Sequence, residues 1–471
     1  MRDGEMRKPK SHKAKVISHK SKVRVRIRVP LTLAFFLLTL GASATGERFG
    51  YPPEEFSARR DRLVKALRTR TPDGTLVMFG ASMAPAGLRF RQDHDFYYLT
   101  GSEAVNAVLV MDIRTGAAHL FMPRLSAREI QYEGGNWLDE KDATTKYGFA
   151  SIQPLTSLYG FLGGRRESAV LWTRLSERDE VNFARGEMAT RLARRLANPF
   201  SQQPTEDAAR VAAIRAQFPS FVFRDVTTHL DRLRLIKTPR EIEILRYNAR
   251  ISAEALKRSI QATAPGKYEY ELEAEATYWM FKHGIQAAAY PAIVGSGPKV
   301  NQWHYEDNGR QMKAGDLVVM DYAGSLDYLT TDITRTWPVS GQFTPQQLKA
   351  YEAALDAQKN LIAAIKPGVQ RSVVRQIAED TLRKHGFDPR YAYMWHYVGM
   401  SVHDVGDGNL PFEAGMALAI EPIIDIPDQQ LHIRIEDTVL VTPAGAEVLS
   451  TAVPKEVTEL LALMRPGTRN P

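Results

Sequence analysis

The sequence of 471 residues contains no cysteine. This absence excludes disulfide bonds, thiol nucleophiles and metal sites with cysteine ligands. No glycine-rich phosphate loop opens any of the helical patterns, and no internal repeat is visible. The apolar stretch VPLTLAFFLLTLG at residues 29–41 is too short to span a bilayer on its own.

The chain also carries little net charge outside its first 44 residues. The formal net charge is +8 and the pI is about 9.3. Residues 1–44 hold eleven Lys and Arg against two acidic residues, which gives this leader +9 and leaves about −1 for residues 45–471. The main part of the protein is therefore near neutral, so the basic pI no longer argues for a nucleic-acid partner.

The leader has the composition of a secretory signal peptide. A basic stretch runs into the apolar residues 29–41, and ASA follows at residues 42–44. A positive region, a short apolar region and an A-x-A site are typical of such a signal. We expect a signal peptide over residues 1–44, cleaved near Ala44, and export to the periplasm or secretion. An uncleaved N-terminal membrane anchor is the alternative.

After the leader, the sequence predicts an α/β domain over residues 47–228. Five short apolar runs are expected to be strands, and helical patterns are seen at residues 187–197 and 206–218. The runs are TLVMFG, DFYYLTG, AVLVMD, AAHLFMP and SAVLWT. We expect a mixed sheet flanked by helices.

A second domain is predicted over residues 236–465. It opens with Thr238-Pro239-Arg240-Glu241, a capping box with proline at the first helical position. A long helix should follow and end near Pro265. Further helices are expected at residues 269–283, 345–365 and 372–385, with hairpins from residue 289 onward. This mixture predicts an α+β fold.

Two aspartates stand out in VVMDYAGSLDYLTTDITRTW, residues 318–337. A hairpin with its turn at Leu326-Asp327 would place Asp321 directly opposite Asp332. Opposed carboxylates repel, so one takes up a proton unless a cation lies between them. Exposed acids on a strand near a loop are the alternative for this segment alone.

A second hairpin weakens that alternative. Glu421 and Glu436 lie in apolar strands on either side of the polar stretch PDQQ, and a turn at Asp428-Gln429 would make them face each other. Buried carboxylates need partners, because moving a charge out of water costs several kcal/mol. Two hairpins that each carry opposed acids within apolar strands are hard to explain by acids on solvent-exposed strand faces.

A histidine completes the candidate site. MWHYVGMSVHDVGD supplies His396 and His403, although a histidine in an apolar segment can also be a satisfied core residue. One imidazole with four carboxylates suits Mn²⁺, Co²⁺ or Zn²⁺, and the high negative charge favours two ions. Two such ions can share a bridging water, lower its pKa and polarise a carbonyl, as amide or ester hydrolysis requires.

These residues resemble a known family. In order and spacing they are similar to the ligands of the pita-bread metallopeptidases, which include methionine aminopeptidase, aminopeptidase P, prolidase and the non-metal creatinase. Aminopeptidase P (Xaa-Pro aminopeptidase) resembles the chain most, over roughly residues 50–450. The matching segments are RFRQDHDFYYLTG, LIKTPREIEILR, YPAIVGSGPKVNQWHYEDN, MDYAGSLDYLTTDITRTWPVSG, HYVGMSVHDVG, GMALAIEP and IRIED.

The resemblance implies a role for each candidate residue. It implies that Asp321 binds one metal, that His396 and Glu421 bind the other, and that Asp332 and Glu436 bridge both. Glu421 would also be the general base. The remaining implied roles are contact with the substrate by His304 and His403 and orientation of the Asp321 side of the site by Arg434.

The resemblance also implies the substrate and assembly. Proline lacks an amide N–H and has a fixed φ, so a pocket shaped for its ring accepts Xaa-Pro bonds that other peptidases reject. Short proline-containing peptides, Mn²⁺ and a homo-oligomer (dimer or tetramer) are expected. The segment DGNLPF at residues 407–412 is shorter than the family's loop there, which bears on the proline pocket and on peptide length.

Three alternatives stay open. A prolidase-type dipeptidase would use the same metal site on Xaa-Pro dipeptides, although RQDHDFYYLTG favours aminopeptidase P. A catalytically silent pita-bread homologue would serve as a binding module, but such proteins usually lose ligands. A creatinase-like enzyme without metal is disfavoured for the same reason.

Overall fold

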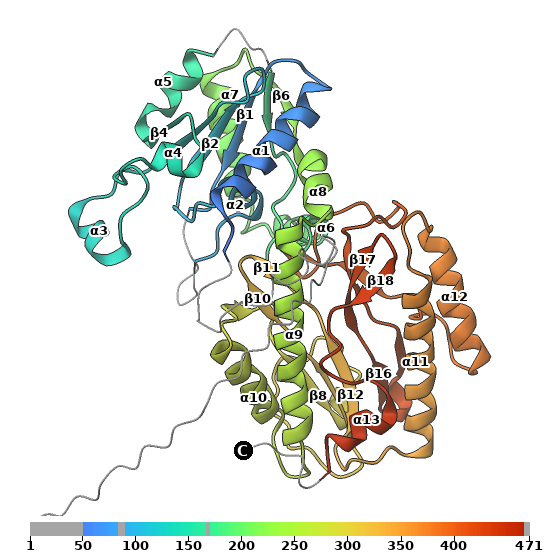
Figure 1. Ribbon diagram of the computed structural model, residues 1–471. Coiled ribbons are helices and arrows are strands. Elements are labelled where there is room, and N and C mark those ends of the chain that lie inside the picture. The colour runs from blue at the N-terminus through green and yellow to red at the C-terminus, as the bar shows by residue number, and fades with distance from the viewer. Residues whose placement is uncertain (1–49, 83–89, 166–169, 466–471) are drawn as a thin grey trace, which may run out of the picture. The chain divides into compact units, whose positions relative to one another are not determined.

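The computed structural model describes residues 50–82, 90–165 and 170–465 (Figure 1). Its contacts divide the chain into two units, Met1–Glu47 and Arg48–Pro471. The expected signal peptide lies outside the described residues. Within those three ranges, no helix combines the length and the apolar character that crossing a bilayer demands.

Strands β1 to β6 form one sheet with the order β4-β3-β2-β1-β5-β6. β1 runs antiparallel to β2 and parallel to β5, so the sheet is mixed as expected. The strands are β1 Thr75–Phe79, β2 Val108–Asp112, β3 Ala118–Met122, β4 Ser151–Pro154, β5 Val170–Thr173 and β6 Val222–Asp225. The helices around them are α1 Pro53–Arg68, α2 His94–Thr100, α3 Ala127–Glu133, α4 Ala143–Tyr147, α5 Leu158–Gly163, α6 Arg185–Leu196, α7 Glu206–Gln217 and α8 Thr227–Leu235, with a short 3-10 turn η1 at Leu155–Ser157.

Buried side chains cover both faces of this sheet. Successive side chains of a strand point to opposite faces, so neighbouring residues of β1 belong to different clusters. In β1, Leu76 belongs to one buried cluster together with Leu63 of α1. Its neighbour Val77 belongs to another together with Ile214 of α7. The fully apolar run of β1 is therefore explained by burial on both sides.

The segment DFYYLTG was wrongly expected to be a strand. It forms helix α2, which Asp93 caps by accepting a hydrogen bond from the backbone N–H of Phe96. Gly101 ends the helix with a φ of 69°, a left-handed conformation that glycine adopts at little cost. Aromatic residues favour strands, but these two caps and burial of nearly every residue of α2 favour a helix here.

The helices of the second half begin and end close to the expected residues. Thr238 caps α9 in the predicted capping box with Glu241, and the helix ends three residues before Pro265. The helices are α9 Pro239–Ala262, α10 Glu269–Lys282, α11 Pro345–Ala364, α12 Arg371–Lys384 and α13 Val457–Ala462, with 3-10 turns η2 Gly297–Lys299 and η3 Pro427–Gln429. The boundaries expected for the two domains stay predictions.

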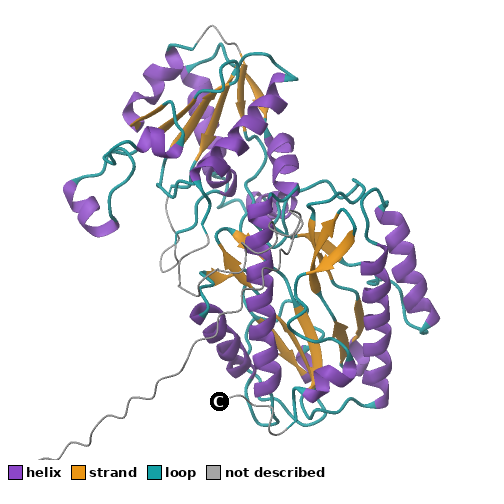
Figure 2. Cartoon of the chain, viewed as in Figure 1, coloured by secondary structure: helices purple, strands orange, loops and turns teal. Residues whose placement is uncertain are grey.

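The strands of this half form small sheets between the long helices (Figure 2). In Figure 1, α9 and α10 lie on one side of these strands, and α11 and α12 lie on the other. The sheets have the orders β11-β10-β7, β12-β9-β8, β13-β14-β17-β18 and β15-β16. The strands are β7 Ala287–Ala288, β8 Ile293–Ser296, β9 Leu317–Asp321, β10 Gly324–Leu326, β11 Leu329–Thr330, β12 Thr334–Pro338, β13 Trp395–Tyr397, β14 Ala417–Ile420, β15 Ile423–Ile426, β16 Leu431–Arg434, β17 Asp437–Thr442 and β18 Gly445–Val448.

The expected register is wrong for the first hairpin. Asp321 pairs with Thr334 rather than with Asp332, which precedes β12. The turn consists of Asp327 and Tyr328, one residue later than expected, and both have positive φ, 46° and 68°. This two-residue turn shifts the pairing by two residues. Asp332 therefore does not lie directly opposite Asp321 in the strand pairing.

The expected register is confirmed for the second hairpin. Ile423 pairs with Arg434 and Ile420 pairs with Asp437, so Glu421 and Glu436 occupy opposed positions. Both glutamates lie in short breaks between strands rather than inside them. These breaks turn the two carboxylates away from regular sheet positions and toward one site.

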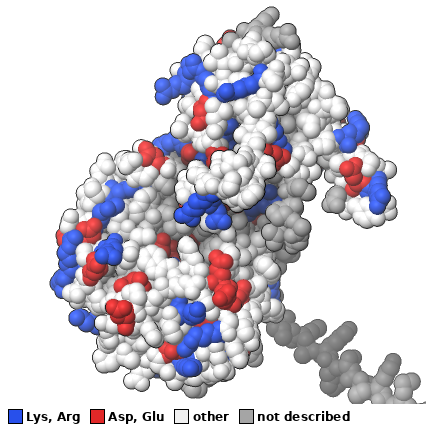
Figure 3. Space-filling model, turned by 180° about the vertical axis from the view of Figure 1, so that it is seen from behind, with Lys and Arg blue, Asp and Glu red and all other residues white. Residues whose placement is uncertain are grey.

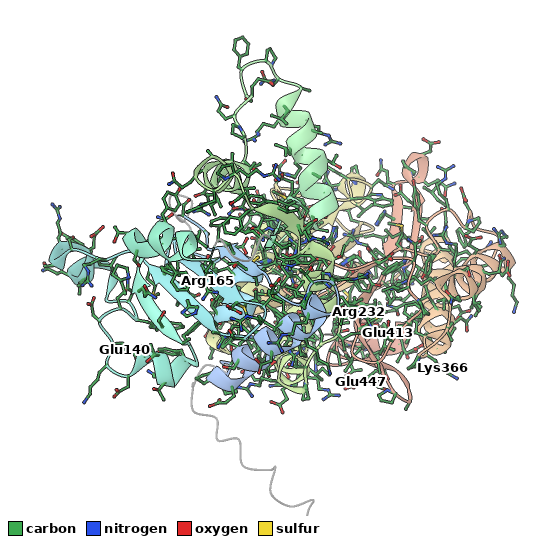
Figure 4. The ribbon with its side chains drawn as sticks, turned by 90° about the horizontal axis from the view of Figure 1, so that it is seen from above. Glu140, Arg165, Arg232, Lys366, Glu413 and Glu447 are labelled. Carbon is green, nitrogen blue, oxygen red and sulfur yellow. The ribbon has the colours of Figure 1, made fainter. Side chains whose placement is uncertain are left out.

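Ion pairs join the segment around α8 to the C-terminal strands. Arg232 donates to both carboxylate oxygens of Glu413 at 2.9 and 2.6 Å, and Figure 4 labels the two side by side. Arg246 of α9 holds Glu447 of β18 in the same bidentate way. On the face shown in Figure 3, Lys and Arg are interspersed with Asp and Glu, as expected for a nearly neutral body.

Candidate metal centre

The five candidate ligands come from five separate positions in the second half of the chain. Asp321 is the last residue of β9, and Asp332 lies just before β12. His396 is the middle residue of β13, which pairs with β14. Glu421 follows β14, and Glu436 lies between β16 and β17. Residues 115 positions apart in the chain are thereby brought together by the sheet connections.

His396 lies at the centre of the carboxylates. Its Nε2 atom is 3.3 Å from Asp332 Oδ2, 3.8 Å from Glu421 Oε1 and 3.8 Å from Glu436 Oε1. Ligand atoms of Asp332, His396 and Glu436 all lie within 4.8 Å of one another. The structure therefore brings together four of the five candidate ligands around one ring nitrogen.

A tyrosine connects the fifth ligand to the others. The Tyr290 hydroxyl lies 2.6 Å from Asp321 Oδ1 and 2.5 Å from Asp332 Oδ1. A phenol carries one proton, so it donates to one of these oxygens at a time. Burial, with the charges of Asp321 and Asp332, holds the pKa of Tyr290 well above its ordinary value. Sequence reasoning missed this residue, although it opens the matching segment YPAIVGSG.

Arg434 lies behind the Asp321 side of the site. Its Nη2 atom is 3.0 Å from Asp321 Oδ2, and both side chains are buried. Burial and the charge of Asp332 raise the pKa of Asp321 to about 8, against the lowering effect of Arg434. Burial also acts to lower the pKa of His396, but the hydrogen bond and charge of Asp332 raise it to about 9. These shifts have one cause, the crowding of negative charge in a buried site.

The side chains present fit divalent metal ions. Glu436 Oε1 is buried and has no hydrogen-bond partner among the described residues, whereas Glu436 Oε2 accepts a hydrogen bond from Thr334 Oγ1 at 2.7 Å. Burial and the charges of Asp332 and Glu421 raise the pKa of Glu436 well above its ordinary value. A divalent cation would satisfy the free oxygen and neutralise this charge, and four carboxylates with one imidazole suit borderline-hard ions.

The two further histidines lie differently. The His403 ring is 4.2 Å from the His396 ring between centroids, and its Nδ1 atom is 2.9 Å from Glu187 Oε1. His304 is exposed in the segment after η2. Desolvation, together with the charge of Arg434, lowers the pKa of His304. The metal and substrate roles expected for all these residues stay predictions.

The Tyr290 contact leads to the first testable prediction. Tyr290→Phe should weaken the affinity for Mn²⁺ by roughly 10- to 100-fold, because the hydroxyl orients two of the candidate ligands. Isothermal titration of the metal-free protein with Mn²⁺ measures the affinity. Tyr351→Phe is the matched control, since the hydroxyl of this buried tyrosine donates a hydrogen bond to the Lys455 carbonyl, away from the candidate ligands. An unchanged affinity in Tyr290→Phe would show that the hydroxyl does not support the ligands.

Known proteins resemble this chain over most of its length. Residues 243–443 match metallopeptidase family M24, and residues 56–171 match the N-terminal domain of aminopeptidase P. The chain is 28% identical over 449 residues to the Xaa-Pro aminopeptidase of Escherichia coli, covering 87% of this chain and 97% of that protein. It is 30% identical over 446 residues to the mitochondrial intermediate cleaving peptidase 55 of Arabidopsis thaliana, covering 87% of this chain and 83% of that protein.

A solved structure agrees with these matches. Aminopeptidase P from E. coli with the inhibitor Pro-Leu superposes with a TM-score of 0.72 at 27% identity, covering 88% of this chain and 98% of that chain. The human Xaa-Pro dipeptidase is more distant, at 25% identity over 504 residues, covering 90% of this chain and 96% of the relative. The chain belongs to metallopeptidase family M24 and has its pita-bread catalytic fold, preceded by an aminopeptidase P N-terminal domain.

Proposed function

We propose that the protein is an Xaa-Pro aminopeptidase, which removes the first residue from peptides with proline in the second position. The observation that carries the proposal is the convergence of three carboxylates within 4 Å of His396 Nε2, on a fold matched by aminopeptidases P. The E. coli enzyme, which this chain resembles, has been solved with the inhibitor Pro-Leu. That dipeptide is what remains when the first residue is cut from an Xaa-Pro-Leu peptide.

Two divalent ions are proposed for the site, with Mn²⁺ the first choice and Co²⁺ or Zn²⁺ as alternatives. Asp332 and Glu436 are the proposed shared ligands. Asp321 would hold one ion, and His396 and Glu421 would hold the other. When bound, the ions supply a water of lowered pKa and polarise the scissile carbonyl.

The protein's own residues then complete the reaction. Glu421 accepts the proton of the attacking water and donates it to the proline nitrogen as the amide C–N bond breaks. Arg434 holds the Asp321 carboxylate in place. His403, whose ring lies 4.2 Å from that of His396, contacts the substrate and helps to hold the tetrahedral intermediate in place. His304 contacts the substrate from the rim of the site.

Two further features of the protein are proposed here. We infer a homo-oligomer, a dimer or tetramer, from the similarity of the chain to Xaa-Pro aminopeptidases. Export to the periplasm or secretion is supported by the basic and apolar composition of residues 1–44.

The competing function is that of an Xaa-Pro dipeptidase. We expect the Mn²⁺-loaded protein to release Xaa from Xaa-Pro-Yaa tripeptides and to cleave Xaa-Pro dipeptides much more slowly. Chromatography of the products from a matched set, Xaa-Pro-Yaa, Xaa-Pro and Xaa-Ala-Yaa, measures both the length and the proline preference. Cleavage of the dipeptide alone would reassign the protein as a dipeptidase. Equal cleavage of Xaa-Ala-Yaa would remove the proline preference.

A further inference from the structure

The segment that carries His403 is held by residues from the first half of the chain. The backbone N–H of Val402 donates to the Val181 carbonyl at 2.7 Å. The Ser401 hydroxyl donates to Asp179 Oδ2 at 2.6 Å. Arg234 donates to Asp404 Oδ1 at 2.7 Å. Three residues that flank His403 are therefore fixed by partners that are not candidate metal ligands.

His403 itself has a partner on α6. Its Nδ1 atom lies 2.9 Å from Glu187 Oε1. An ionised carboxylate can only accept a hydrogen bond, so the proton of this contact lies on Nδ1. The hydrogen bond fixes the tautomer and the plane of the ring, and it leaves Nε2 on the side away from Glu187.

Glu187 is itself well placed to act as a fixed partner. Its second oxygen, Oε2, accepts a hydrogen bond from the backbone N–H of Ala184 at 2.8 Å. Two residues earlier, Arg185 donates to both oxygens of the buried Asp95 and to Asp231. The start of α6 is thereby anchored to two other helices, α2 and α8. The carboxylate that meets His403 is not a freely rotating surface group.

We propose that Glu187 is a positioning residue that sets the orientation and tautomer of His403. The first half of the chain would then supply one wall of the catalytic site of its own chain, through residues 179–187. This inference rests on the proposed function of His403 in peptide hydrolysis. Glu187 does not touch the reacting atoms and acts through the imidazole.

A purely structural role for Glu187 is the competing explanation, because Oε2 also caps α6. Glu129 offers a matched control. At the start of α3, Glu129 Oε2 accepts from the backbone N–H of Ser126 at 2.7 Å, which is the same capping contact without a histidine. Glu129→Ala should therefore reproduce the loss of a cap while leaving hydrolysis unchanged.

The kinetic test uses the Mn²⁺-loaded protein and an Xaa-Pro-Yaa tripeptide. Glu187→Ala should lower kcat and kcat/KM together by roughly 10- to 100-fold, because the interaction helps only in the transition state. Glu187→Gln retains an oxygen that can accept from Nδ1, so it should recover part of the loss. The double variant of Glu187→Ala with His403→Ala should be no slower than His403→Ala alone, since one residue acts through the other.

A second readout does not depend on activity. The ¹⁵N shifts of the His403 ring, recorded in Zn²⁺-loaded protein at a pH where the ring is neutral, report its tautomer. We expect the Nδ1–H form in the wild type and in Glu129→Ala, and a mixture in Glu187→Ala. An unchanged tautomer in Glu187→Ala, or losses that add fully in the double variant, would overturn the inference. A wild type that cleaves no Xaa-Pro-Yaa peptide would instead contradict the proposed function, and the tautomer would still decide the role of Glu187.

Discussion

Glu421→Gln is expected to lower kcat for Xaa-Pro-Yaa hydrolysis by roughly 10²- to 10⁴-fold, the usual contribution of a general base. The substituted amide keeps the shape of the side chain but cannot take a proton from the attacking water. The carboxylate lies 3.8 Å from His396 Nε2, at the position where the polypeptide leaves β14. KM should change much less than kcat, because the lost step belongs to the transition state.

This prediction needs a metal measurement and a control. Mn²⁺ content after dialysis separates loss of proton transfer from loss of the ion, since Glu421 is also a proposed ligand. Glu413→Gln is the matched control, because this glutamate lies eight positions earlier and pairs with Arg232 at the surface. A Glu421→Gln protein that holds its metal and cleaves the tripeptide at the wild-type rate would remove Glu421 from the role of base.

Glu436→Ala is expected to lower metal loading and to abolish hydrolysis. The proposed role of this residue is to bind both ions, so its loss should weaken each of them by more than the roughly 10- to 100-fold that an outer partner costs. Burial supports the prediction: Glu436 is 1% exposed, and its Oε1 atom has no hydrogen-bond partner in the described part of the chain. The bound Mn²⁺ should fall from about two ions per chain to one or none.

Elemental analysis after equilibrium dialysis measures this ratio directly. Glu447→Ala is the control, since Glu447 is paired with Arg246 on the outer surface and should leave loading intact. Circular dichroism and the melting temperature check that both variants fold. Full loading with two ions in Glu436→Ala would show that the site is built on other ligands.

The helices of the second half could be predicted because their signals are local. Thr238 and Glu241 form a capping box within four residues, and the structure contains both hydrogen bonds. Thr344 and Gln347 do the same at the start of α11. Such signals depend only on neighbouring residues, so tertiary contacts do not alter them.

The two hairpins show where local reasoning fails. The stretch PDQQ between apolar strands marks its turn clearly, and the register that follows from it is correct. The other turn contains Asp327 and Tyr328, and a tyrosine with positive φ is not a usual signal for a two-residue turn. Distant contacts stabilise it: Tyr328 stacks on Tyr97 at 3.6 Å, and its hydroxyl accepts from the backbone N–H of Gln92.

Two supporting residues of the site, Tyr290 and Glu187, could not be predicted for the same reason. Tyr290 lies 31 and 42 positions from the aspartates that it contacts. Glu187 lies 216 positions from His403. No periodicity or spacing in the sequence links such pairs. Acidic residues within apolar strands can be recognised, because burying a charge without a partner costs free energy. The candidate ligands could therefore be proposed from the sequence, and Arg434 from the family resemblance, whereas Tyr290 and Glu187 could not.

The measurement that tests the central claim most directly is the release of free Xaa from an Xaa-Pro-Yaa tripeptide, followed by mass spectrometry. The protein is assayed with Mn²⁺, after chelation, and after Mn²⁺ is restored. We expect Xaa and Pro-Yaa as the only products, loss of cleavage on chelation and recovery with Mn²⁺. Hydrolysis that persists in the chelated protein, or no hydrolysis by a protein shown to hold its metal, would contradict the assignment of these carboxylates and His396 to a metal-dependent aminopeptidase.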